Sequence, residues 1–143
     1  MSDFLDVLAR DANETIDSGY YETLKPTERV RISLRKAILE SKATPVITEI
    51  KAASPSAGII RTNVKASMIA KAMAKGGATA ISVLTEPKHF NGSLDALTQA
   101  RRAVKLPILM KDIPGDRNDT LIRRDTARHV PTFITFSPSI SNI

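Results

Sequence analysis

The spacing of apolar segments constrains the fold of this chain more than any other feature. Three short apolar runs, at 45–50, 79–86 and 106–113, recur about every 30 residues. Segments with helical periodicity, at 65–77 and 94–104, separate them. Alternation of this kind builds a parallel sheet with right-handed crossovers. The runs are almost wholly apolar, as expected for strands that are covered on both faces. The sequence therefore predicts an α/β fold.

The two predicted helices between the strands have recognisable ends. Ser93 is placed to cap the second helix, and Gly76 is placed to stop the first. Helical spacing predicts that the first helix turns four apolar residues toward the core: Met68, Ile69, Ala72 and Met73.

Residues 1–43 are predicted to form a helical extension before the alternating region of 44–113. Apolar residues recur at helical spacing in two stretches, 3–17 and about 28–41, and Thr27 is placed to cap the second. A turn-rich break separates the two helices.

The pattern is lost after Ile113, where Pro114-Gly115 marks the change. Residues 114–143 contain polar and turn residues, a short basic stretch and one apolar patch, VPTFITF. This composition does not predict a further helix and buried strand. We expect a divergent, weakly structured tail.

Composition excludes several classes of site. The 143 residues suffice for one domain with a core, and they include no cysteine, so disulfides, thiolate catalysis and Cys-based zinc sites are ruled out. The two histidines, His89 and His129, cannot form a metal cage by themselves. The chain has no apolar run long enough to span a membrane, and its first residues do not resemble a secretory signal. We expect a cytoplasmic protein without a metal.

The charge balance favours a small anionic ligand. The formal net charge is +6, but the basic residues are spread along the chain and aromatic residues make up only 4%. Nucleic-acid platforms stack bases on aromatic side chains, so this composition argues against nucleic acid as a partner. A positive field instead suits a phosphorylated metabolite.

Polar side chains gather where each predicted strand ends. The pairs are Glu49 and Lys51, then Thr85 and Glu86, then Lys111 and Asp112. Ligands of parallel α/β folds bind at this carboxyl edge, so Glu49, Lys51 and Lys111 should converge there. A lysine partly removed from water can donate a proton near neutral pH, and a carboxylate can orient it. An ion pair at a solvated strand end is the alternative, and residue spacing alone leaves both open.

Three segments resemble the indole-3-glycerol phosphate synthase family. They are EIKAASPSAGIIR, AISVLTEPKHFNGSLDAL and LPILMKDI, and they contain the family's E-I-K-x-x-S-P-S, S-V-L-T-E…F-x-G-S and P-[IV]-L-x-K-D elements in order. SLRKAILESK also resembles the extension that, in the family, packs over the barrel mouth. The resemblance covers roughly residues 1–113.

The resemblance implies a (β/α)8 barrel that needs no cofactor and acts on a phosphorylated substrate. The family converts 1-(2-carboxyphenylamino)-1-deoxyribulose 5-phosphate to indole-3-glycerol phosphate, releasing carbon dioxide and water. By motif match, Lys111 would be the general acid, with Glu49 and Lys51 as catalytic partners. Ser54 and Phe90 would contact the substrate, although a turn role for Ser54 and loop packing for Phe90 remain open.

A complete barrel of this type needs at least about 200 residues. The resemblance therefore implies a truncated TIM barrel, made of the extension and the first three β/α units. We expect such a chain to lack synthase activity alone and to self-associate through exposed sheet edges. Two other functions stay open: a non-catalytic module that binds a phosphate ligand, and an assembly fragment completed by another chain.

Overall fold

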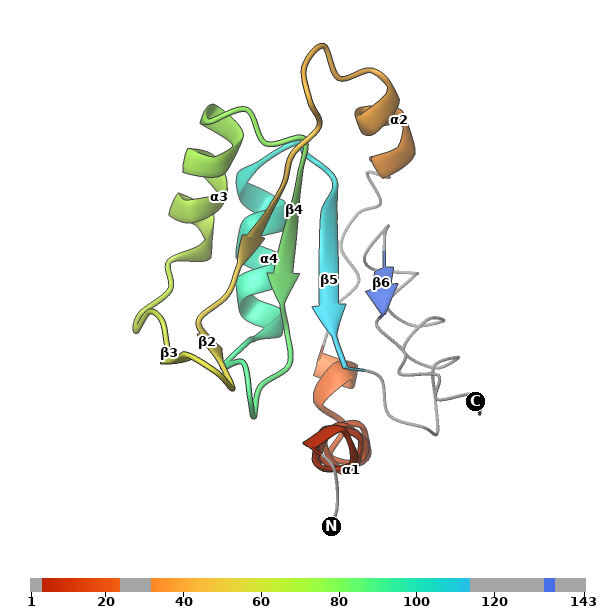
Figure 1. Ribbon diagram of the computed structural model, residues 1–143, viewed down its shortest axis with the longest axis vertical. Coiled ribbons are helices and arrows are strands. Elements are labelled where there is room, and N and C mark those ends of the chain that lie inside the picture. The colour runs from red at the N-terminus through yellow and green to blue at the C-terminus, as the bar shows by residue number, and fades with distance from the viewer. Residues whose placement is uncertain (1–3, 24–31, 114–132, 136–143) are drawn as a thin grey trace.

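The computed structural model describes residues 4–23, 32–113 and 133–135, and Figure 1 shows its helices and strands around one parallel sheet. The elements in chain order are α1 (Phe4–Asp17), the 3-10 helix η1 (Tyr20–Thr23), α2 (Leu34–Leu39), β1 (Ile47–Ile50), β2 (Ala53–Ser54), β3 (Gly58–Ile59), α3 (Ala66–Lys75), β4 (Ala80–Leu84), α4 (Leu94–Ala103), β5 (Ile108–Asp112) and β6 (Phe133–Thr135).

The main sheet has the strand order β1-β4-β5-β6, and every neighbouring pair is parallel. The strands β1, β4 and β5 are the three that the apolar runs predict. The α/β class and the parallel sheet are therefore confirmed. Within the described residues the sheet stays open, with β1 at one end and β6 at the other.

One face of the sheet packs against α3 and α4 (Figure 1). The strand residues that form this buried core are apolar: Ile50, Ile81, Val83, Ile108 and Met110. Alanine and leucine side chains of the two helices, among them Ala70, Leu97 and Ala100, complete this core. Burying each large apolar side chain contributes roughly 1.5 to 3 kcal/mol. The alternation of side chains along a strand then directs Glu49 and Lys111 to the opposite face.

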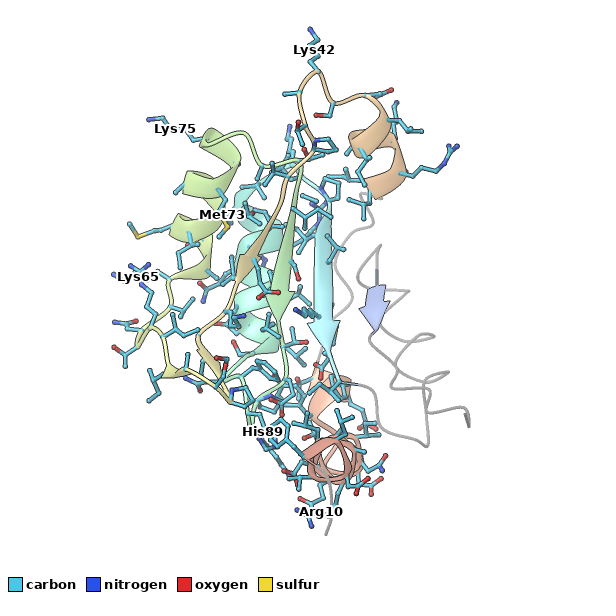
Figure 2. The ribbon with its side chains drawn as sticks, in the orientation of Figure 1. Arg10, Lys42, Lys65, Met73, Lys75 and His89 are labelled. Atoms are coloured by element: carbon cyan, nitrogen blue, oxygen red, sulfur yellow. The ribbon has the colours of Figure 1, made fainter. Side chains whose placement is uncertain are left out.

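The predicted inner face of α3 is partly wrong. Met73 and Ile69 pack against the core, but Met68 is 63% exposed and Ala72 is also exposed. The fully buried positions are Ala66 and Ala70. Their small side chains lie in the core with residues of α4, so the helix turns these two alanines toward the core in place of Met68 and Ala72. Figure 2 shows Met73 toward the sheet and Lys65 and Lys75 pointing outward.

The second helix of the extension is shorter than predicted. It begins after Ser33, whose hydroxyl accepts a hydrogen bond from the Lys36 backbone N–H at 3.2 Å. Thr27, the predicted cap, lies outside the described residues. In Figure 1, α2 lies at the end of the sheet where the strands begin, whereas α1 lies at the carboxyl end. Only α1 is therefore near the edge expected to hold the site.

Three short strands, β2, β3 and β6, lie outside the helices and strands that the sequence predicts. The segment 53–63, expected to be a loop, contains the antiparallel pair β2–β3. In the C-terminal region, β6 pairs in parallel with β5, and Lys111 lies opposite Ile134. Of the predicted tail 114–143, only the three residues of β6, 133–135, are among the described residues.

Candidate functional site

Three charged side chains meet at the carboxyl edge of the sheet. The Lys111 Nζ atom lies 2.8 Å from Glu49 Oε2, and the Lys51 Nζ atom lies 3.0 Å from Glu49 Oε1. Glu49 is on β1 and Lys111 is on β5, so their side chains reach across the intervening strand β4. Each oxygen of one carboxylate thus engages a different ammonium group. The predicted convergence of these residues is present in the structure.

The electrostatics of this cluster favour ionised groups. The side chains of Glu49, Lys51 and Lys111 are 29%, 35% and 34% exposed, so water partly screens their charges. Partial burial raises the pKa of Glu49, but hydrogen bonds from Lys111 and Lys51 outweigh it and hold the pKa below its usual value. One carboxylate between two ammonium groups leaves a net positive charge. This arrangement suits an anionic ligand and a proton donor held in place.

Ser54 has a structural role in the hairpin after β1. Its hydroxyl accepts a hydrogen bond from the Ala57 backbone N–H at 3.1 Å and lies 3.5 Å from the Ser56 hydroxyl. The tight turn continues through Gly58, whose φ of 64° favours glycine. These contacts fit the turn role, and they leave a further contact with a ligand untested.

Phe90 belongs to the loop that follows β4, residues 86–92. Its backbone carbonyl accepts a hydrogen bond from Ala53 N at 3.1 Å, which joins this loop to the hairpin after β1. The Phe90 side chain is half-buried. The two loops that carry Ser54 and Phe90 are therefore tied together by backbone contact.

Glu86 organises the 86–92 loop, and sequence reasoning did not include it in the site. Its side chain is buried, and its carboxylate accepts backbone hydrogen bonds from Lys88 at 2.9 Å, His89 at 2.7 Å and Phe90 at 2.9 Å. A glutamate followed by proline directly after a buried strand was the available signal. The carboxylate is thus an internal scaffold for the turn that presents Phe90.

The loop also requires a glycine where its ends meet. The Gly92 N–H donates to the Glu86 carbonyl at 2.8 Å. A Cβ atom at Gly92 would lie 2.5 Å from the Leu84 carbonyl oxygen and 2.8 Å from that of Glu86. Only glycine permits this close approach of two backbone segments.

The first helix docks on the outer side of the same loop. The His89 Nε2 atom lies 2.8 Å from Asp11 Oδ2, and the Lys88 Nζ atom lies 2.6 Å from Glu14 Oε2. The hydrogen bond with His89 lowers the pKa of Asp11. Figure 2 shows His89 beside α1, with Arg10 on the far side of that helix. The acidic face of α1 therefore contacts the basic face of the loop.

A second polar cluster occupies the helix-facing side of the same strand ends. The Tyr20 hydroxyl donates to the Thr85 carbonyl at 3.0 Å and accepts from Leu94 N, at the start of α4, at 3.2 Å. Thr85 and Asp112 are buried, and their Oγ1 and Oδ2 atoms are 2.6 Å apart. Tyr21 interacts with the same carboxyl group. Neither tyrosine was predicted to approach the site.

Metal and membrane features were searched in the part of the chain that the structure describes. No group of three or more acidic or histidine side chains there is arranged to hold a metal ion. No helix among those residues is long and apolar enough to cross a bilayer.

Comparison with known proteins identifies the family. Residues 7–119 match the family model for indole-3-glycerol phosphate synthase. The chain is 52% identical to the indole-3-glycerol phosphate synthase of Methanocaldococcus jannaschii over 92 residues, which are 60% of this chain and 34% of that protein. It is 42% identical to that of Mycolicibacterium vanbaalenii over 108 residues, which are 75% of this chain and 38% of that protein.

A third relative, the indole-3-glycerol phosphate synthase of Sulfurimonas denitrificans, is 55% identical over 67 residues, covering 47% of this chain and 26% of that protein. This chain belongs to the indole-3-glycerol phosphate synthase family. It spans about a third of the length of the curated relatives that it matches.

Proposed function

We propose that this chain provides the first three β/α units of an indole-3-glycerol phosphate synthase barrel and, with them, one part of its active site. Two observations support this assignment: the family match over residues 7–119 and the parallel order of β1, β4 and β5. The observation that carries it is the meeting of Lys111, Glu49 and Lys51 at the carboxyl edge. That edge holds the active site in barrels of this type.

The proposed reaction closes the indole ring of 1-(2-carboxyphenylamino)-1-deoxyribulose 5-phosphate. The aromatic carbon attacks the ketone carbon, while Lys111 donates a proton to the ketone oxygen. Loss of carbon dioxide and water then gives indole-3-glycerol phosphate. In this scheme Glu49 orients the Lys111 ammonium group through the 2.8 Å contact. No cofactor is required.

The second lysine has a separate role in this proposal. Lys51 binds an anionic group of the substrate, because an ammonium near a strand end suits a carboxylate or a phosphate. Ser54 contributes a polar contact from the hairpin, and Phe90 packs on the aromatic ring. The hydrogen bond from Ala53 N to the Phe90 carbonyl supports a shared role, since it holds the two loops together.

Turnover in this proposal needs strands that lie outside the present sheet. The sheet of the described residues is open, and β1 at its end leaves Val46 49% exposed and Ile47 43% exposed. A closed eight-stranded barrel would cover such an edge. We therefore propose that turnover depends on strands beyond those of the described residues, with a phosphorylated substrate bound at the carboxyl edge of the completed barrel.

A mixing experiment tests the assignment. The purified chain is assayed for indole-3-glycerol phosphate formation alone and after refolding with a polypeptide that carries the remaining strands of the Methanocaldococcus jannaschii relative. We expect no turnover alone and clear turnover in the mixture. Lys111→Met should abolish this turnover, whereas Lys75→Met, on the outer face of α3, should preserve it (Figure 2).

Each contrary result has a defined meaning. Turnover by these 143 residues alone would overturn the need for further strands. A folded mixture that binds the substrate without turnover would replace the synthase assignment with a phosphate-ligand binding module. Equal activity of the Lys111→Met mixture would refute the role of Lys111.

A further inference from the structure

The backbone carbonyl of Lys111 faces two donors of a single neighbouring residue. The Thr85 N–H donates to the Lys111 carbonyl oxygen at 2.9 Å, and the Thr85 Oγ1 atom lies 3.2 Å from the same oxygen. The same Oγ1 atom lies 2.6 Å from Asp112 Oδ2. Thr85 therefore stands between the carboxyl group of Asp112 and the peptide of the candidate general acid.

A threonine hydroxyl carries one hydrogen and cannot donate to both acceptors at once. When Asp112 is ionised, its carboxylate is the stronger acceptor and takes the Thr85 hydrogen. When Asp112 is protonated, its own O–H can donate to Thr85 Oγ1. The Thr85 hydrogen is then available to the Lys111 carbonyl, which gains a second hydrogen bond.

The surroundings of Asp112 bring this exchange close to neutral pH. Burial raises the pKa of Asp112 to about 6, against the lowering effect of hydrogen bonds from Thr85, Tyr21 and the Ile113 N–H. The charge of Glu86, at the end of the neighbouring strand, also raises the pKa of Asp112. Two other titratable groups of the described residues lie near this cluster: Tyr20, which bonds to the Thr85 carbonyl, and Lys111, which points to the other face.

We propose that Thr85 is a positioning residue whose hydroxyl hydrogen moves between Asp112 and the Lys111 carbonyl, so that the protonation state of Asp112 sets how firmly the Lys111 peptide is held. The Tyr20 hydroxyl keeps the Thr85 peptide in place at 3.0 Å, so the hydroxyl can rotate while its backbone stays fixed. The catalytic meaning of this contact rests on the proposed function, but the contact itself does not.

Carbon-13 NMR of the full chain tests the proposal between pH 4.5 and 8. We expect the Asp112 carboxyl carbon and the Lys111 carbonyl carbon to titrate with one shared midpoint near pH 6. In Thr85→Val the shift of the Lys111 carbonyl carbon with pH should shrink to the small part that its peptide bond to Asp112 transmits, while the Asp112 midpoint should rise because a donor to its carboxylate is lost. Thr85→Ser restores the hydroxyl and should restore the shared midpoint.

Two variants serve as controls. Thr98→Val removes a hydroxyl that bonds to the Leu94 carbonyl within α4, at 3.0 Å, and should leave both titrations unchanged. Asp112→Asn should make the Lys111 signal constant between pH 5 and 7. If Thr85→Val does not fold, Thr85→Ser and Asp112→Asn still decide the matter.

The proposal is overturned if the Lys111 carbonyl titrates in Asp112→Asn as it does in the unchanged chain, or if it never titrates near pH 6. It is also overturned if the Lys111 carbonyl carbon shifts as far with pH in a folded Thr85→Val variant as it does in the unchanged chain. Because no substrate is needed, failure of this proposal and failure of the synthase assignment are separate results.

Discussion

Lys111 and Asp112 are neighbours in β5, yet they lie in opposite environments. Lys111 is about one-third exposed on the face toward Glu49, and its charge is held by an ion pair at 2.8 Å. Asp112 is buried on the helix-facing side, where desolvation raises its pKa to about 6. Two consecutive residues of β5 thus belong to different clusters on opposite faces of the sheet. Lys111 belongs to the ion-paired cluster with Glu49, and Asp112 belongs to the buried hydrogen-bonded cluster with Thr85.

The difference shows that partners and burial act on a carboxyl group in opposite directions. Glu49 has two ammonium partners and some solvent, so its pKa is lowered. Asp112 has hydroxyl and N–H partners but almost no solvent, so burial wins and its pKa is raised. A carboxyl group at this sheet edge is therefore tuned by the face on which its strand places it.

The largest expected effect belongs to Glu86, a buried carboxylate that is held by backbone donors. Glu86→Ala leaves the N–H groups of residues 88, 89 and 90 without this acceptor, so we expect a loss of about 3 kcal/mol in the free energy of unfolding. Urea unfolding at pH 7 measures this loss. The control Glu14→Ala breaks an exposed ion pair and should cost less than about 1 kcal/mol. Equal losses would show that the Glu86 contacts do not stabilise the loop.

The next largest effect is the pH dependence that Asp112 gives to the free energy of unfolding. Its pKa in the folded chain lies above the usual 3.8, so the folded state binds the proton more tightly. Its contribution to stability is therefore greatest below about pH 4 and declines as the pH rises to about 6. We expect Asp112→Asn to remove a decline of about 3 kcal/mol, measured as the difference between the two stability-versus-pH curves. A constant difference would contradict the raised pKa.

Tyr20 and Tyr21 are expected to have different roles. Tyr20 stabilises the fold through backbone hydrogen bonds, whereas Tyr21 lowers the pKa of Asp112. Tyr20→Phe removes hydrogen bonds to the Thr85 carbonyl and from Leu94 N, so it should cost about 1 to 2 kcal/mol at every pH. Tyr21→Phe should instead move the Asp112 titration to higher pH, because Tyr21 lowers the pKa of that carboxyl group. Urea unfolding measures the first effect and carbon-13 NMR the second. If both variants lost the same stability and shifted the Asp112 titration equally, the two tyrosines would not have different roles.

The smallest effect on stability is expected at Glu49. Its side chain is about one-third exposed, so Glu49→Gln should change the free energy of unfolding by less than about 1 kcal/mol. The sign is opposite to that of Asp112. Because the pKa of Glu49 is lowered, its stabilisation is present above pH 4.5 and is lost as the pH falls. Stability curves of both variants between pH 3 and 8 would reveal the opposite slopes.

Regular sequence patterns predict the positions of the strands well and the buried face of a helix less well. Apolar runs predict β1, β4 and β5, and the shared carboxyl edge of parallel strands predicts that Glu49 and Lys111 lie together. Periodicity was weaker for α3, where closely spaced apolar residues left the inner face ambiguous and Met68 was assigned wrongly. A strand of three residues such as β6 is too short for periodicity to reveal.

The contacts of the N-terminal segment were beyond sequence reasoning for a different reason. Tyr20 bonds to residues 65 and 74 positions later in the chain, and nothing near Tyr20 encodes these partners. Glu86 was visible as a polar residue at a strand end, but its three backbone donors depend on the path of the loop. Such contacts follow from tertiary geometry and not from local composition.

The docking of α1 and η1 also has a consequence for the order of events on the ribosome. The contact of Asp11 with His89 can form only after His89, 78 positions later, has been synthesised. The hydrogen bond between Tyr20 and Leu94 likewise requires Leu94 to have been synthesised. At translation speeds of 5 to 20 residues per second, that delay is roughly 4 to 16 s. The residues of this segment are synthesised before the sheet but reach their final positions only after β4 and α4 have emerged. During this interval the Tyr20–Tyr21 pair lacks the core against which it packs in the folded chain.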